Sequence, residues 1–193
     1  IVDGGILYPQ SGGRAIRRID YSEQAGGYLS ANVSMRAAFL VQQPIDAFAQ
    51  RGGVTYEADR YFLITSAGYM PVYASLVSQD FTAWCRYVTD GKFLAGGAEE
   101  QGSAYVITER TINGAAIRYV EGFDPKRLLD CSILIDLAAA GGELTGVTHL
   151  EGRTVYAINR TTGWWYGPMT VTGAVITAPD GQEFDAGEYE VGL

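Results

Sequence analysis

The sequence predicts a mainly β protein, in which antiparallel meander sheets of propeller-blade or sandwich type, with one short helix, precede a small β-barrel domain. Three observations support this prediction. Runs rich in Val, Ile, Tyr and Thr recur about every ten residues, and glycine-containing turns separate them. The 193 residues also include 25 Gly and 13 Tyr, but only 19% are charged. This composition is typical of a globular protein with many short strands and tight turns.

The clearest element is a hairpin formed by residues 103–110 and 115–121. Both runs have the composition of strands, and Asn113-Gly114 between them can adopt the positive φ angles of a type I′ turn. Residues 81–88 form a further predicted strand, and the turn at 89–92 leads into the next strand from Phe93. We therefore expect an antiparallel meander here.

The first predicted domain, residues 1–124, contains the meander and the one helix. We expect the helix over residues 32–42, because Asn32 is a suitable N-cap and Pro44 stops it. Apolar residues of this segment, including Met35 and Phe39, fall near one face, so the short helix must dock against the domain to be stable. A loop with a single turn is the alternative. Further strands are predicted at 6–9, 14–21, 45–49, 61–65 and 72–77, with Gly68 in the turn between the last two.

Asp124-Pro125 breaks the strand pattern and marks a domain boundary. The second predicted domain covers residues 128–193. Short strands are expected at 131–137, 154–159, 164–171, 174–177 and 188–191. A small barrel or sandwich would fit them, because closing a sheet removes its exposed edges.

Charge and hydropathy exclude some classes of function. The net charge of −8 argues against a surface that grips the phosphate backbone of DNA, although the wall of a channel through which DNA slides would tolerate that sign. No apolar run reaches the roughly 18 residues of a membrane-spanning helix. Both ends of the chain have strand-like sequence, so we expect an internal fragment of a longer protein.

The sequence indicates no catalytic, cofactor or metal site. His149 is the only histidine, and a turn residue that hydrogen-bonds the backbone is the simpler interpretation than a base or zinc ligand. Glu109 and Glu121 could act as paired carboxylates, but cross-strand ion pairs with Arg110 and Arg118 on a solvated face are the simpler account. The two cysteines, Cys85 and Cys131, could pair in a disulfide, but we expect free thiols, with Cys85 packed inside its strand.

One aromatic cluster, Trp164-Trp165-Tyr166, is unusual. It could belong to the core, contact a neighbouring subunit or stack on a sugar ring. Alternation along a strand would send Trp164 and Tyr166 to one face and Trp165 to the other, so at least one of the three is expected in the core.

The predicted meander also carries an ordered set of motifs, W-x-R-x-x-T-D-G, V-x-x-E-R-x-I-N-G and R-Y-x-E. Their order and spacing resemble a segment of the tail nozzle proteins, also called stabilisation or tail tubular proteins, of short-tailed bacteriophages. The residues that carry this resemblance are Trp84, Arg86, Thr89, Asp90, Gly91, Glu109, Arg110, Ile112, Asn113, Gly114, Arg118, Tyr119 and Glu121.

The second half resembles the same family. A G-x-x-H-L-E-G-x-T-V run is followed by a V-x-G-A-x-I-T strand and a closing V-G-L. The motif residues here include His149, Leu150, Glu151 and Gly152. The segment from Gly163 to Pro168 departs from the family, which more often has a short D-G turn at this place.

The resemblance implies a non-enzymatic structural protein of the virion, assembled in the bacterial host cytoplasm. It implies self-association into a ring, commonly a hexamer, that adjoins portal and adaptor proteins and passes DNA during ejection without binding it tightly. The alternative is a carbohydrate-binding or glycan-degrading module of a phage or bacterial surface protein, with the aromatic cluster as its platform. A third hypothesis is a barrel-type interaction domain.

Overall fold

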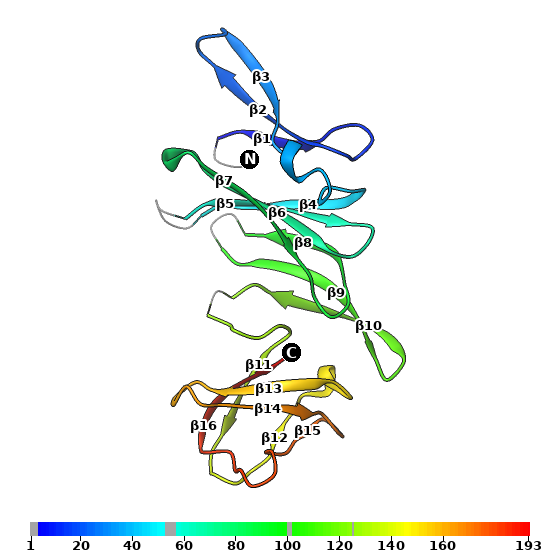
Figure 1. Ribbon diagram of the computed structural model, residues 1–193, viewed down its shortest axis with the longest axis vertical. Helices are drawn as coiled ribbons and strands as arrows, with labels where there is room; N and C mark the ends of the chain where they lie inside the picture. Colours follow the sequence, from blue (N-terminus) through cyan, green and yellow to red (C-terminus); the bar gives the residue numbers. More distant parts are fainter. Residues whose placement is uncertain (1–3, 53–56, 100–101, 125) are drawn as a thin grey trace. The chain divides into compact units, whose positions relative to one another are not determined.

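The computed structural model describes residues 4–52, 57–99, 102–124 and 126–193 (Figure 1). The fold is mainly β with antiparallel sheets, as the sequence predicts. The chain divides into two compact units. Unit 1 comprises Ile1–Arg110 and Arg118–Phe123, and unit 2 comprises Thr111–Ile117 and Asp124–Leu193. The tip of the predicted hairpin is therefore grouped with unit 2, although the sequence assigned it to the first domain.

Unit 1 begins with a three-stranded sheet of β1 (Ile6–Pro9), β2 (Ile16–Ser22) and β3 (Gly27–Asn32), in that order. Its first two strands lie where the sequence predicts them. β3 was not predicted, because Gly26, Gly27 and the mixed residues that follow lack a clear alternation of apolar and polar residues.

The second sheet is a regular meander of β4 (Pro44–Gln50), β5 (Asp59–Thr65), β6 (Met70–Leu76) and β7 (Phe81–Tyr87). β5 is buried on both faces: Phe62 and Ile64 belong to one core cluster, whereas Tyr61 and Leu63 belong to another. This explains why residues 61–65 read as a continuous apolar run instead of an alternating one.

The third sheet of unit 1 has the order β10-β9-β8, with β8 (Lys92–Ala98), β9 (Ala104–Ile112) and β10 (Ala115–Gly122). Asn113 and Gly114 have φ angles of 49° and 78°. Both angles are positive, which confirms the predicted type I′ turn. β8 packs closely on the second sheet, since a Cβ atom on Gly96 would clash with the Phe48 ring.

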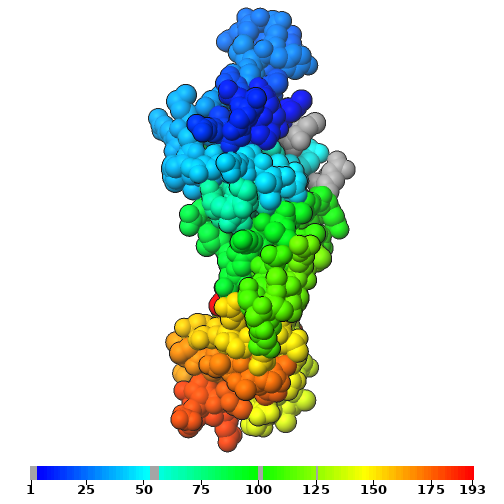
Figure 2. Space-filling view, turned by 90° about the vertical axis from the view of Figure 1, so that its right-hand side faces the viewer, coloured from blue at the N-terminus to red at the C-terminus, as the bar shows by residue number. Residues whose placement is uncertain are grey.

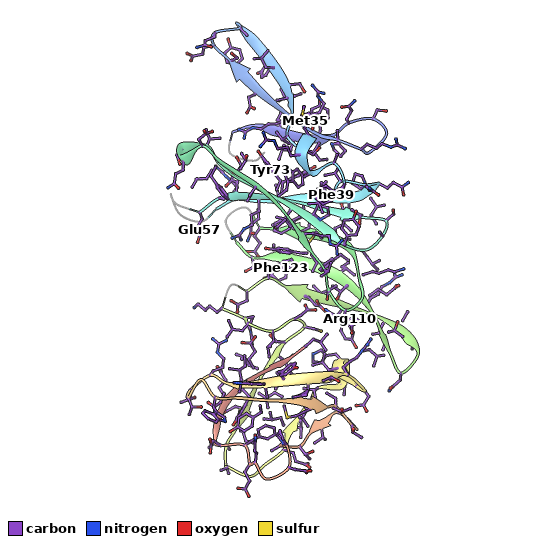
Figure 3. The ribbon with its side chains drawn as sticks, in the orientation of Figure 1. Met35, Phe39, Glu57, Tyr73, Arg110 and Phe123 are labelled. Carbon is purple, nitrogen blue, oxygen red and sulfur yellow. The ribbon has the colours of Figure 1, made fainter. Side chains whose placement is uncertain are left out.

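The predicted helix over residues 32–42 is wrong. The described residues contain only three short 3₁₀ helices: η1 (Met35–Ala37), η2 (Val77–Gln79) and η3 (Thr148–Leu150). Asn32 ends β3, and its side-chain oxygen accepts hydrogen bonds from the amide and hydroxyl of Ser34, a local turn that competes with a helix. Met35 and Phe39 are exposed (Figure 3), so the expected docking face does not exist and one turn remains.

Unit 2 has a four-stranded antiparallel sheet of order β11-β16-β13-β14 and a two-stranded sheet of β12 and β15. Their bounds are β11 (Ile133–Leu137), β12 (Leu144–Thr145), β13 (Thr154–Asn159), β14 (Trp165–Thr170), β15 (Val175–Ile176) and β16 (Gly187–Gly192). Both sheets contribute to one core, for example through Leu144, Ile176 and Tyr189. No closed barrel is found among the described residues, so the barrel stays a prediction.

Candidate functional site

The motifs in the predicted meander converge on Arg110 (Figure 3). Its side chain is only 2% exposed. Its Nε and Nη2 atoms donate to the two carboxylate oxygens of Glu121, each over 2.8 Å, and Nη1 donates to the carbonyl oxygen of Asp90 over 2.7 Å. One guanidinium therefore ties the T-D-G turn to both strands of the hairpin. Gly91 permits this arrangement with φ 143°, where a Cβ atom would strike the Glu109 carbonyl.

Both expected cross-strand ion pairs are present. Arg118 Nε lies 3.2 Å from Glu109 Oε2, and Arg110 pairs with Glu121. The expectation that both lie on a solvated face is wrong for Arg110. Along β9 the buried positions alternate through Val106 and Arg110, so Arg110 occupies a core-facing position.

The other motif residues of unit 1 also contact the scaffold. The Trp84 indole Nε1 donates to the Val33 carbonyl over 2.9 Å, and its ring packs 5.1 Å from that of Tyr73. The guanidinium of Arg86 lies over the Tyr69 ring, 5.3 Å from its centroid, in a cation–π contact. Tyr119, on β10, is half-buried.

In unit 2, the motif residues 149–152 organise a turn. A ring nitrogen of His149, Nε2, donates to the Cys131 carbonyl over 3.0 Å, which confirms His149 as a turn residue bonded to the backbone. Leu150 is buried in the core, and the Gly152 amide donates to Val171. The Glu151 carboxylate accepts the amides of Gly173 and Ala174 over 2.8 and 2.7 Å.

The turn that Glu151 holds contains Ala174 at φ 63°. The left-handed conformation costs a residue with a Cβ atom about 1–2 kcal/mol. Replacing alanine by glycine costs roughly 0.4–1 kcal/mol, because glycine gives the unfolded chain more conformational entropy. We expect Ala174→Gly to raise the free energy of unfolding of unit 2 by about 0.5–1 kcal/mol in urea denaturation. The control Ala157→Gly, in the buried part of β13, should lower it by about 1–2 kcal/mol. A loss of stability in Ala174→Gly would contradict this account.

A second buried carboxylate was not predicted from the sequence. Glu190 on β16 has 0% exposure and accepts hydrogen bonds from the amides of Leu128 and Leu129, over 2.7 and 2.9 Å, and from Arg160 over 2.7 Å. Burial raises the pKa of Glu190. The hydrogen bonds from Leu129, Leu128 and Arg160 together lower the pKa by more than burial raises it, so it lies below its ordinary value. Nothing in the pattern Glu188-Tyr189-Glu190 separates this residue from its exposed neighbour Glu188.

The aromatic cluster divides between core and surface. Tyr166 is buried, as expected of at least one member, and packs against Phe184 and Tyr189. Burial, followed by interactions with Tyr189, raises the pKa of Tyr166 to about 12. Trp165 is exposed on the opposite face. Trp164 was expected on the face of Tyr166 but is exposed, because it precedes β14 in a loop closed by the hydrogen bond from Asn159 N to Trp164 O.

The remaining residues with potentially reactive or metal-binding side chains do not form a cluster. Among the described residues, no group of three or more His, Cys, Asp or Glu side chains could hold a metal ion. Cys85 and Cys131 are not joined in a disulfide, as predicted, but Cys85 is exposed on β7 and not packed. On the same strand, the neighbouring residue Trp84 packs against the core.

In the described part of the chain, no helix has the length and apolar character needed to cross a membrane. Comparison with models of known protein families and with curated protein sequences found no match.

Proposed function

We propose that this chain is part of a structural, non-enzymatic component of a phage tail, a nozzle or stabilisation protein that forms a wall section of the DNA-ejection channel. The proposal comes from the ordered motifs that resemble this family. It places the protein in the virion after assembly in the bacterial cytoplasm, in a ring that contacts portal and adaptor proteins.

One observation supports it above the others: the motif residues bind one another. In unit 1 the three motif segments meet at Arg110, and in unit 2 Glu151 joins the L-E-G turn to the turn at Gly173. A channel wall requires a rigid β scaffold, and these contacts help to maintain one. In this proposal, residues 128–193 form a small barrel- or sandwich-like module that docks to neighbouring proteins.

The charge of the chain agrees with this role. A net charge of −8 repels the phosphate backbone, so DNA would pass the wall without tight binding. The glycan-binding alternative requires a coplanar aromatic strip. The rings of Tyr156 and Trp165 lie 6.0 Å apart but are inclined by 45°, which favours the structural role.

Immunogold labelling of virions from the phage that encodes this protein tests the proposal. Antibodies against the chain should decorate the tail, at the end of the portal and adaptor channel. A control antibody against the major capsid protein should label the head alone. Particles that carry no label on the tail, although the chain is detected in the lysate, would contradict the proposal.

A further inference from the structure

β7 is the last strand of the second sheet, which lies between the other two sheets of unit 1 (Figure 1, Figure 2). One edge of β7 pairs with β6 over all seven of its residues, without a shift of register. Among the residues that the structure describes, no strand pairs with the other edge. β7 therefore presents a regular row of backbone donors and acceptors that a further strand can bind.

Proteins usually protect such an edge with Pro, Lys, a bulge or a covering element. Other end strands of this chain have such features. β4, at the opposite end of the same sheet, begins with Pro44 and changes register between Pro44 and Asp46. β14, at one end of the four-stranded sheet of unit 2, contains Pro168. β7 contains no Pro, Gly or Lys, and its Phe, Thr, Trp and Tyr residues are types enriched in strands, so its sequence favours an added strand.

The side chains at this edge are incompletely covered. Trp84 packs against the core cluster shared with the first sheet, and Tyr87 packs against the cluster shared with the third, so alternate residues face opposite sides. Both rings are half-buried, whereas Phe81 and Cys85 are exposed. A strand added to β7 would cover side chains on both sides of the sheet, and such side-chain contacts give strand addition its specificity.

β7 is complementary to a second copy of itself. Two antiparallel copies that use every residue of the strand have a single register, which is centred on Trp84. In that register, Phe81 lies opposite Tyr87, Thr82 opposite Arg86, and Ala83 opposite Cys85. Directly opposed aromatic residues stabilise a sheet, and the register places no like charges opposite each other.

We propose that β7 of one copy pairs antiparallel with β7 of a second copy in this register and joins the two four-stranded sheets into one. The contact is isologous, because each strand offers the same residues to the other. It closes with two copies, so it is separate from the contacts that build the proposed ring. The inference goes beyond the proposed function and does not depend on it.

Disulfide crosslinking of the full-length protein tests the register. In Ala83→Cys, the new thiol lies directly opposite Cys85 of the other copy. Opposed Cα atoms of an antiparallel pair are about 4.5–5.5 Å apart, which a disulfide spans. In the wild type, the two Cys85 residues are diagonal neighbours about 7–8 Å apart, which is too far for a disulfide. Mild oxidation should therefore link positions 83 and 85 of different copies in the variant alone.

Thr82→Cys is the matched control, because position 82 precedes position 83 on the same strand but faces the other side of the sheet. It should form no link to Cys85 of another copy. Mass spectrometry of a mixture of isotope-labelled and unlabelled copies identifies the linked positions and distinguishes links between copies from links within one. Equal linkage from the two variants would overturn the inference, as would an Ala83→Cys protein that forms no more covalent dimer than the wild type.

A second measurement uses the pairing of Thr82 with Arg86, both of which are exposed. Thr82→Lys, added to Ala83→Cys, places like charges opposite each other at two symmetric positions. In a glutathione redox buffer, it should lower the equilibrium ratio of covalent dimer to reduced chains by roughly 2- to 30-fold. Thr82→Glu should raise the ratio by a similar factor, because it forms ion pairs with Arg86. Equal effects of Lys and Glu would contradict the proposed register.

Discussion

Replacing Arg110 by Met is expected to lower the free energy of unfolding of unit 1 by about 3–5 kcal/mol. The substitution keeps most of the apolar volume but removes both hydrogen bonds to Glu121 and the one to the Asp90 carbonyl. It takes the guanidinium away from the Glu121 carboxylate, whose side chain is largely buried. Because the chain has two units, hydrogen exchange of peptides from β8, β9 and β10 is the suitable measurement, since it reports on this sheet alone.

The same hairpin offers a matched control. Arg118 forms the other cross-strand ion pair, with Glu109, but its side chain is 69% exposed. Arg118→Met should therefore change stability by about 0–1 kcal/mol. The double variant Arg110→Met with Glu121→Leu removes both charges of the pair and should recover much of the lost free energy of unfolding. Equal small effects at positions 110 and 118 would show that Arg110 does not organise the motif turn.

Glu190→Gln is expected to lower the free energy of unfolding of unit 2 by about 3–5 kcal/mol. The buried carboxylate accepts two backbone amides and Arg160, and a neutral amide would place an NH₂ donor against at least one of these donors. Arg160 would also lose its ion pair. Hydrogen exchange of peptides from β13 and β16 follows this unit, and the exposed residue Glu183 provides the control Glu183→Gln.

The pKa of Glu190 also predicts a pH dependence. Its folded-state pKa lies below the ordinary value of 4.5, so its contribution to stability is complete above about pH 4.5 and is lost as the pH falls through the folded-state value. Wild-type unit 2 should therefore lose stability in this acid range more steeply than Glu190→Gln does. Parallel acid titrations of the two proteins would contradict the assigned role of Glu190.

Local signals in the sequence predicted the strands and turns well. Asn113-Gly114 between two β-rich runs identified the hairpin, and Gly68 identified the turn before β6, because these backbone conformations depend on a few adjacent residues. The helix at 32–42 failed because Asn32 and Ser34 bond each other locally, a choice that apolar periodicity does not reveal.

The candidate sites could be predicted only in part. The pairing of Arg110 with Glu121 follows from their places on paired strands, but the burial of Arg110 depends on which face of β9 packs on the second sheet. Glu190 is buried because the segment at Leu128 folds over it, a contact between residues 62 positions apart. Such long-range packing leaves no local pattern in the sequence.

The oligomeric state of the full-length protein is the most direct test of the proposal that the chain belongs to a channel wall. Light scattering combined with negative-stain electron microscopy measures both the number of subunits and the shape of the particle. The account predicts a closed ring, commonly sixfold, with an axial hole wide enough for duplex DNA. A protein that remains a stable monomer, even with portal and adaptor proteins present, would contradict it.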